Sequence, residues 1–211
     1  MGKWTRRGFI GAGIVTGGAL VIGVAIRPGH RAPGLAKYVA GEDESLVNAW
    51  VKIDRNNKVT AIVPHSEMGQ GAQTALTQML ADELDARWED VSFLEAPAED
   101  EYANYPLGKG FVLGSTPIPK MLSGTVDGVF LAVTKSLHLQ ITGGSSSIRA
   151  TGVYGMRVAG AAAKIMLREA AAEKWGVNSE EVVAQEGMLI HSASSNKATY
   201  ADFASQAAEK T

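Results

Sequence analysis

The chain has 211 residues, a hydrophobic share of 45% and a net charge of −2, values typical of an ordinary globular protein of one or two domains. It has neither an excess of basic residues nor an aromatic platform, so we expect no nucleic acid among its partners. The absence of cysteine excludes disulfides, cysteine nucleophiles and any iron–sulfur cluster ligated by this chain itself.

The first thirty residues are typical of an export signal. Lys3, Arg6 and Arg7 form a positively charged region, and the uncharged stretch 8–26 follows it. The paired arginines, followed after one spacer by phenylalanine and isoleucine, resemble the twin-arginine motif. We predict that residues 1–30 direct export to the periplasm by the twin-arginine route. The stretch is just long enough to span a bilayer, so it is either removed or retained as a membrane anchor.

The rest of the chain divides into three parts. Residues 31–46 read as a linker. Residues 47–176 predict an α+β domain in which a β-hairpin and short strands pack with two main helices. Residues 177–211 predict the start of a further unit of strand, turn and helix, truncated at the end of the chain.

Hydrophobic periodicity places the individual elements. Alternation of apolar and polar residues predicts a hairpin of two strands over 47–53 and 59–63. A further short strand is expected over 91–95, after a turn over 88–90. Helical spacing of apolar residues predicts one helix over 72–84 and a second, alanine-rich helix over about 154–175. Between them, residues 96–142 read as an irregular loop or wrapping segment that contains a short helix over 126–139.

The predicted strand over 182–191 opens the last part of the chain. A turn follows it, and Thr199 with Asp202 resembles a capping box for a final helix.

Two glycine-containing segments precede the two main helices. Gly69, Gln70 and Gly71 lie where the second hairpin strand gives way to the first helix. The glycines let the backbone approach a ligand closely, and free amide groups at a helix start favour an electron-rich partner. Gln70 could present its carboxamide to such a ligand. The alternative is a polar turn that only caps the helix.

The second segment is richer in hydroxyl groups and precedes the alanine-rich helix. Hydroxyls and backbone amides that converge before a helix suit a phosphate group, although no Walker loop is present because no Lys-Ser/Thr pair follows. The alternative is a solvated loop. The residues are Gly143, Gly144, Ser145, Ser146 and Ser147.

At these two segments the sequence resembles a known family. Residues 63–91 (VPHSEMGQGAQTALTQMLADELDARWEDV) and 141–175 (ITGGSSSIRATGVYGMRVAGAAAKIMLREAAAEKW) resemble the two molybdopterin-binding signatures of the xanthine oxidase superfamily. The similarity is greatest to the branch that contains the isoquinoline 1-oxidoreductase large subunit and membrane-bound aldehyde dehydrogenases. The predicted hairpin also fits the start of that domain.

The resemblance implies a function for these residues. It implies that Gln70 reaches the oxo ligand of molybdenum from the second coordination shell, that Gly69 and Gly71 shape its loop, and that the Gly/Ser segment lies near the cofactor. The cofactor implied is molybdopterin cytosine dinucleotide. The reaction is oxidation of aldehydes or N-heteroaromatic compounds. Electrons leave through a separate small subunit with [2Fe-2S] clusters, towards a membrane cytochrome c.

One feature of the family is missing from the sequence. Its large subunits are several times longer, and their general-base glutamate lies near the far carboxyl end, so no catalytic residue can be assigned here. The chain is therefore expected to act with the remainder of a large subunit and to be inactive alone. The alternative functions are a membrane-anchored periplasmic assembly or interaction module that has lost the chemistry, and an exported binder of a small ligand.

Overall fold

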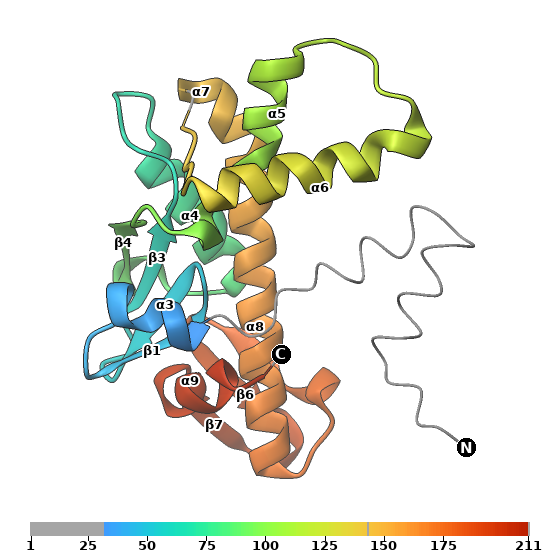
Figure 1. Cartoon of the computed structure of the whole chain (residues 1–211). Coiled ribbons are helices and arrows are strands. Elements are labelled where there is room, and N and C mark those ends of the chain that lie inside the picture. Colours follow the sequence, from blue (N-terminus) through green and yellow to red (C-terminus); the bar gives the residue numbers. More distant parts are fainter. Residues whose placement is uncertain (1–31, 143, 211) are drawn as a thin grey trace, which may run out of the picture.

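The computed structural model describes residues 32–142 and 144–210, and its two sheets and helices confirm the predicted α+β class (Figure 1). The predicted export signal, residues 1–30, lies outside the described residues, as does Gly143. Of the helices in the described part, none is long and apolar enough to cross a membrane.

The larger sheet has four strands in the order β1-β2-β3-β4. They are β1 (Glu44–Asn48), β2 (Val51–Asp54), β3 (Val59–Val63) and β4 (Val91–Glu95). The first three pair antiparallel, and β4 pairs parallel with β3. The predicted hairpin is thus present as β2 and β3, and the predicted strand over 91–95 is confirmed.

The first predicted strand, over 47–53, is wrong as a single element because it is broken into β1 and β2. The Asn48 side chain causes the break: its Oδ1 accepts a hydrogen bond from the Trp50 backbone N–H at 2.9 Å. Asparagine commonly makes this local turn, which competes with a continuous strand.

The predicted linker over 31–46 is also wrong, because it contains helix α3 (Ala32–Val39) and the start of β1. Leu35 and Val39, one helical turn apart, are buried in a small core. This core also contains Leu46, Ile62, Ala96 and Tyr102.

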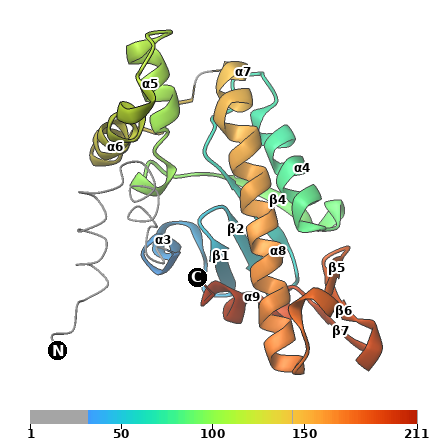
Figure 2. The ribbon, with the colours of Figure 1, turned by 90° about the vertical axis from the view of Figure 1, so that its right-hand side faces the viewer.

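Two long helices run side by side in the same direction (Figure 2). They are α4 (Ala72–Leu84) and α8 (Val153–Trp175), as predicted. Gly152 faces Leu76, Gly160 faces Leu80, and the Lys164 ammonium lies 2.7 Å from the Asp85 carboxylate. These contacts advance together along both helices, so the amino ends of the two helices lie at the same end of the pair.

The region 96–142, predicted to be mostly irregular, contains more helix than expected. A 3₁₀ turn, η2 (Asp100–Tyr102), leads to α5 (Tyr105–Leu113) and α6 (Lys120–Ser136), which project from the rest of the molecule (Figure 1). The Asn104 side chain caps α5 by accepting from the Leu107 backbone N–H. Pro106 lies in the first turn, where its missing N–H costs nothing.

The last part of the chain packs against the same core. The predicted strand over 182–191 is a hairpin of β5 (Val183–Gln185) and β6 (Met188–His191), turned at Glu186 and Gly187, which both have positive φ. Strand β7 (Asn196–Thr199) and helix α9 (Ala201–Ala208) follow. Three further 3₁₀ turns are η1 (Trp88–Asp90), η4 (Ser179–Glu181) and η5 (Ser192–Ser194).

Residues 177–210 do not form a separate hydrophobic core, contrary to the division that we predicted at residue 176. Leu189, Tyr200 and Phe203 are buried in one cluster with α4, α8 and the larger sheet. The Tyr200 hydroxyl donates a hydrogen bond to the Leu84 carbonyl at 2.7 Å. The predicted capping box is confirmed, since Thr199 and the Asp202 side chain and backbone bond reciprocally.

Candidate functional site

The two predicted segments lie at the same end of the α4–α8 pair. Each directly precedes one of these parallel helices, so the parallel packing brings them together (Figure 2). His65 lies just before the first segment and Thr151 just after the second. The His65 Nε2 lies 3.3 Å from the Thr151 Oγ1, which joins the two regions directly.

The loop of the first segment is held by its own glutamine. The Gln70 Oε1 accepts from the Met68 backbone N–H at 2.6 Å, and the Gln70 Nε2 donates to the Ser66 carbonyl at 2.8 Å. Gly69 and Gly71 have φ of 88° and 76°, a region that favours glycine. A carboxamide nitrogen carries two hydrogens, so one remains for a ligand.

Glu67 occupies the helix start that the sequence suggested was free. Its carboxylate accepts from the backbone N–H groups of Gly69 (2.8 Å), Gly71 (3.0 Å) and Gln73 (3.2 Å). These bonds, the one from Gly71 foremost, lower the pKa of Glu67. The prediction of free amides is therefore wrong. A carboxylate just before a helix start was the signal that could have identified this cap.

The second segment is helical, not the loop that we predicted. Gly144–Ser147 form the helical turn α7, and a π-helical stretch, η3 (Ile148–Gly152), joins it to α8. Gly144 begins the turn with a φ of 58°. Ser145 and Ser146 are exposed. Ser147 is fully buried, and its hydroxyl has no hydrogen-bond partner among the described residues.

A polar cluster that the sequence did not predict lies between the two segments. The Thr151 hydroxyl donates to the Ser147 carbonyl at 3.1 Å and accepts from the Asn104 Nδ2 at 2.9 Å. A hydroxyl has one hydrogen, so the His65 Nε2 is the donor in its contact with Thr151. Burial lowers the pKa of His65, which favours the neutral ring. The weak sequence signal was a histidine directly between a buried strand and the glycine motif.

This cluster borders a pocket of about 360 Å³. Aromatic side chains from three parts of the chain form much of its wall, so the pocket combines a buried polar cluster with flat apolar surfaces. The lining includes Trp50, His65, Tyr102, Asn104, Thr151 and Tyr154.

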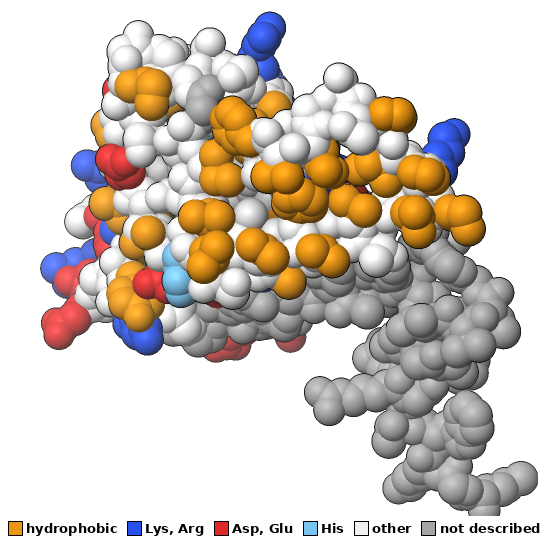
Figure 3. Space-filling model, turned by 45° about the horizontal axis from the view of Figure 1, so that its top comes forward, with side chains coloured by type: hydrophobic (Ala, Val, Ile, Leu, Met, Phe, Trp, Pro, Cys, Tyr) orange, Lys and Arg blue, Asp and Glu red, His pale blue; other side chains and the backbone are white. Residues whose placement is uncertain are grey.

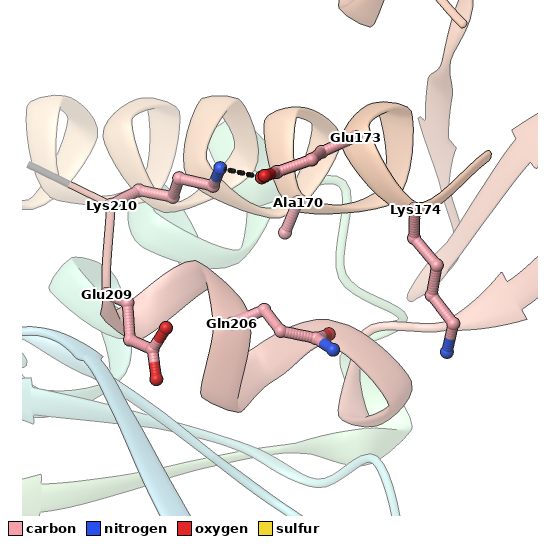
Figure 4. A pocket seen from close by; sticks show the side chains of 6 residues that line it. All are labelled: Ala170, Glu173, Lys174, Gln206, Glu209 and Lys210. Carbon is pink, nitrogen blue, oxygen red and sulfur yellow. Dashed lines mark hydrogen bonds and ion pairs between the residues drawn. The ribbon is translucent and has the colours of Figure 1, made fainter. Parts of the chain in front are cut away.

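A second hollow, of about 400 Å³, lies between α8 and α9 (Figure 4). Glu173, Lys174, Gln206 and Lys210 line it, and Lys210 forms an ion pair with Glu173. It is near the carboxyl end of α8, whereas both glycine segments lie at the amino end. It is therefore separate from the candidate site.

Metal ligation by side chains is not evident in residues 32–142 and 144–210. Within these ranges no group of three or more His, Cys, Asp or Glu side chains could hold a metal ion.

Comparisons with known proteins agree with the resemblance of the two segments. Residues 12–105 match a family described as the molybdopterin cofactor-binding domain, and this range includes the first segment. The isoquinoline 1-oxidoreductase subunit beta of Brevundimonas diminuta is 29% identical over 204 residues, which cover 95% of this chain and 22% of that protein.

A solved structure, quinoline 2-oxidoreductase from Pseudomonas putida 86, is 17% identical with a TM-score of 0.45. The match covers 74% of this chain and 15% of that one.

This chain thus spans about a fifth of the length of its curated relative. Residues 12–105 thus match a molybdopterin cofactor-binding domain, and nearly the whole chain is similar to a part of an isoquinoline 1-oxidoreductase subunit.

Proposed function

We propose that this chain is the amino-terminal cofactor-binding segment of a molybdenum hydroxylase large subunit that oxidises aldehydes or N-heteroaromatic compounds. The observation that carries the proposal is the parallel α4–α8 pair, which brings Gly69–Gly71 and Gly144–Ser147 to one end of the molecule. The name of the relative, isoquinoline 1-oxidoreductase, supports an N-heteroaromatic substrate. The partners proposed are the remainder of the large subunit, a small subunit with [2Fe-2S] clusters and a membrane cytochrome c.

The residues fit a molybdopterin cofactor in two ways. A side chain at Gly69, Gly71 or Gly144 would meet no other atom within 4 Å, so a bulky ligand can approach the backbone at all three positions. The buried Ser147 hydroxyl lacks a partner among the described residues, and a ligand group could supply one. We propose the cytosine dinucleotide form of the cofactor, held by both segments.

When bound, the cofactor supplies a molybdenum centre that accepts electrons from the substrate. The chain's own contribution is to bind and orient. Glu67 fixes the loop by its three backbone hydrogen bonds. The second hydrogen of the Gln70 Nε2, which is not used in the bond to Ser66, would be donated to an oxo ligand. Because Glu67 already binds the amides at the start of α4, the cofactor's phosphates would be held elsewhere. The general base would come from the remainder of the large subunit.

We also propose export to the periplasm by the twin-arginine route, with residues 1–30 removed or retained as an anchor. Arg6 and Arg7 before the uncharged stretch 8–26 support it. That route carries folded proteins, which suits a protein that acquires its cofactor before export.

The experiment is to measure molybdenum, released cytidine nucleotide and turnover in the complex purified from its native source. The wild-type complex should contain molybdenum, release a cytidine nucleotide and show turnover. Gln70→Ala should lower turnover by about one to two decades, because a hydrogen bond to a strongly polarised group contributes roughly 1.5–3 kcal/mol. Molybdenum content should fall much less, since the cofactor is held at many other points.

Gln70→Glu separates the accepting role of the side chain from its donating role. It keeps an oxygen that can accept from the Met68 N–H, but it can donate neither to the Ser66 carbonyl nor to an oxo ligand, so the melting temperature is measured beside turnover to detect a disturbed loop. If the donor matters, Gln70→Glu should lose turnover as Gln70→Ala does. A complex without molybdenum would refute the proposed function. Unchanged turnover in both variants would mean that Gln70 only stabilises its own loop.

A further inference from the structure

The two helices α5 and α6, with the residues up to Leu139, form an arm whose charged side chains face its own chain. The Lys109 ammonium on α5 lies 2.5 Å from the Asp127 carboxylate on α6. The Lys135 ammonium lies 3.9 Å from the carboxylate of Asp100 in η2. Two of the three lysines of the arm are therefore held in ion pairs within the molecule.

The outer side of α6 carries an uncharged apolar stripe. Leu122, Val129, Val133 and Leu137 follow one another at intervals of seven, four and four residues, so they lie on one face of the helix. All four are exposed, as are Met121 on α6 and Phe111 and Val112 on α5. Figure 3 shows hydrophobic side chains gathered in a band along this projecting part of the molecule. An amphipathic helix usually turns its apolar face to its own core, whereas these side chains are exposed in the described chain.

The arm contributes nothing to the two hydrophobic cores of the described chain, since neither contains a residue of 105–139. Gly108 and Thr134 are the buried positions of α5 and α6. By contrast, α4 is shorter than α6 and buries six side chains. Contiguous exposed apolar surface of this kind marks a site of interaction with another molecule or another part of the same polypeptide.

We propose that the outer face of the arm is the docking surface for the polypeptide that corresponds to the remaining four-fifths of the curated relative. The relative matches 95% of this chain, so the matched region contains the arm, yet this chain spans only 22% of the relative. The proposal rests on the proposed function, in which the chain acts with the rest of a large subunit. A membrane surface fits less well, because interfacial helices carry several free basic side chains.

The test uses one substitution at two exposed valines. Val129 on the stripe is 57% exposed, and Val183 on β5 is 53% exposed. The full chain is assembled with the polypeptide of the same organism that aligns with the rest of the relative, whether that polypeptide continues the chain or is separate. Val129→Glu and Val183→Glu are compared by co-purification and by amide hydrogen exchange over residues 120–136.

Assembly should slow exchange of these amides at least tenfold. Val129→Glu should abolish that protection or weaken co-purification at least tenfold, and Val183→Glu should change neither. Both variants should melt as the wild type does, because both side chains are exposed. The proposal would be overturned if the two variants showed the same co-purification and the same amide exchange, or if the wild type did not bind the partner polypeptide.

Two further outcomes would overturn the proposal by identifying another occupant. One is dimerisation of the chain that Val129→Glu abolishes while the partner polypeptide still binds. The other is binding to anionic phospholipid vesicles with the same sensitivity. Molybdenum content of the assembly is read separately. An assembly that depends on Val129 but lacks molybdenum refutes only the proposed function, and one that holds molybdenum without that dependence refutes only the docking surface.

Discussion

Both glycine segments precede a main helix, but they differ in how their polar groups are used. In the first, Gln70 and Glu67 satisfy the backbone of their own loop through five hydrogen bonds. In the second, Ser147 is buried in a helical turn, and its hydroxyl lacks a partner among the described residues. The first segment is therefore pre-organised, whereas the second keeps a buried hydroxyl without a partner among the described residues.

This difference indicates how the proposed site would assemble. A satisfied loop keeps its shape without a ligand, so Gln70 can be positioned in advance. A buried hydroxyl without a partner costs free energy until a ligand or another part of the protein binds it. The two segments would therefore respond differently to cofactor binding, although both lie at the amino ends of α4 and α8.

The largest change in the free energy of unfolding should come from a substitution that separates the two segments. A Cβ at Gly160 would lie 2.5 Å from the Leu80 carbonyl oxygen, a backbone atom that cannot move alone. Gly160→Ala should therefore force α8 away from α4 and lower the free energy of unfolding by roughly 2 kcal/mol or more. A Cβ at Gly155 on the same helix meets nothing within 4 Å. Gly155→Ala should be neutral or stabilise by up to about 1 kcal/mol.

Urea unfolding of both variants measures this prediction. If Gly160→Ala is as stable as Gly155→Ala, the close helix contact does not hold the two segments together.

A smaller change in stability should come from removing the Glu67 carboxylate, which holds the first loop. The pKa of Glu67 is lowered by its bonds to backbone N–H groups, so its ionised form stabilises the folded state. That stabilisation is complete above the ordinary pKa of 4.5 and is lost as the pH falls through the lowered folded value. Glu67→Gln should therefore lower the melting temperature at pH 7, and its difference from the wild type should shrink below pH 4.5.

Glu42→Gln, at an exposed position outside the helices and strands, is the control and should change little at any pH. A melting-temperature difference for Glu67→Gln that stays constant from pH 7 to pH 3 would contradict the role of the ionised carboxylate.

Regular periodicity made much of the central fold predictable. Alternation located β2 and β3, and helical spacing located α4 and α8, because each of these elements buries one face in the main core. The arm was predicted only in part: the short helix over 126–139 overlaps the second half of α6, whereas α5 and the start of α6 were missed because Gly108, Gly110, Gly124 and Gly128 suggested a loop. Apolar side chains also lie on the exposed side of both helices, so the pattern of an ordinary amphipathic helix does not apply.

The buried face of α8 shows a second limit of sequence patterns. The buried stripe of a helix usually contains its larger apolar residues, but Val158 and Ile165 are both about half exposed. The contact with α4 is so close that Ala159, Gly160 and Ala163 face inward instead. Side-chain hydrogen bonds such as those of Glu67 depend on rotamers, which no spacing specifies. The two glycine segments could be picked out in the sequence, but the hydrogen bonds around them could not.

The smallest change in stability should come from removing the Ser147 hydroxyl of the second segment, which has no partner among the described residues. Removing a buried hydroxyl that lacks a partner also removes the cost of its desolvation, so Ser147→Ala should leave the full chain as stable or stabilise it by about 1 kcal/mol. Thr77 on α4 is also buried with its hydroxyl unpartnered among the described residues. Thr77→Val, which keeps the side-chain shape, is therefore the matched control.

The two variants should diverge once the assembly with molybdenum cofactor forms. If the cofactor or the docked polypeptide supplies a partner for Ser147, Ser147→Ala should lower molybdenum content or assembly stability, whereas Thr77→Val should keep its small gain. Urea unfolding of the full chain and metal analysis of the assembly measure the two states. If Ser147→Ala destabilises the full chain in the absence of cofactor and partner polypeptide, the hydroxyl already has a hydrogen-bond partner there. The two segments would then not differ in whether their polar groups are satisfied.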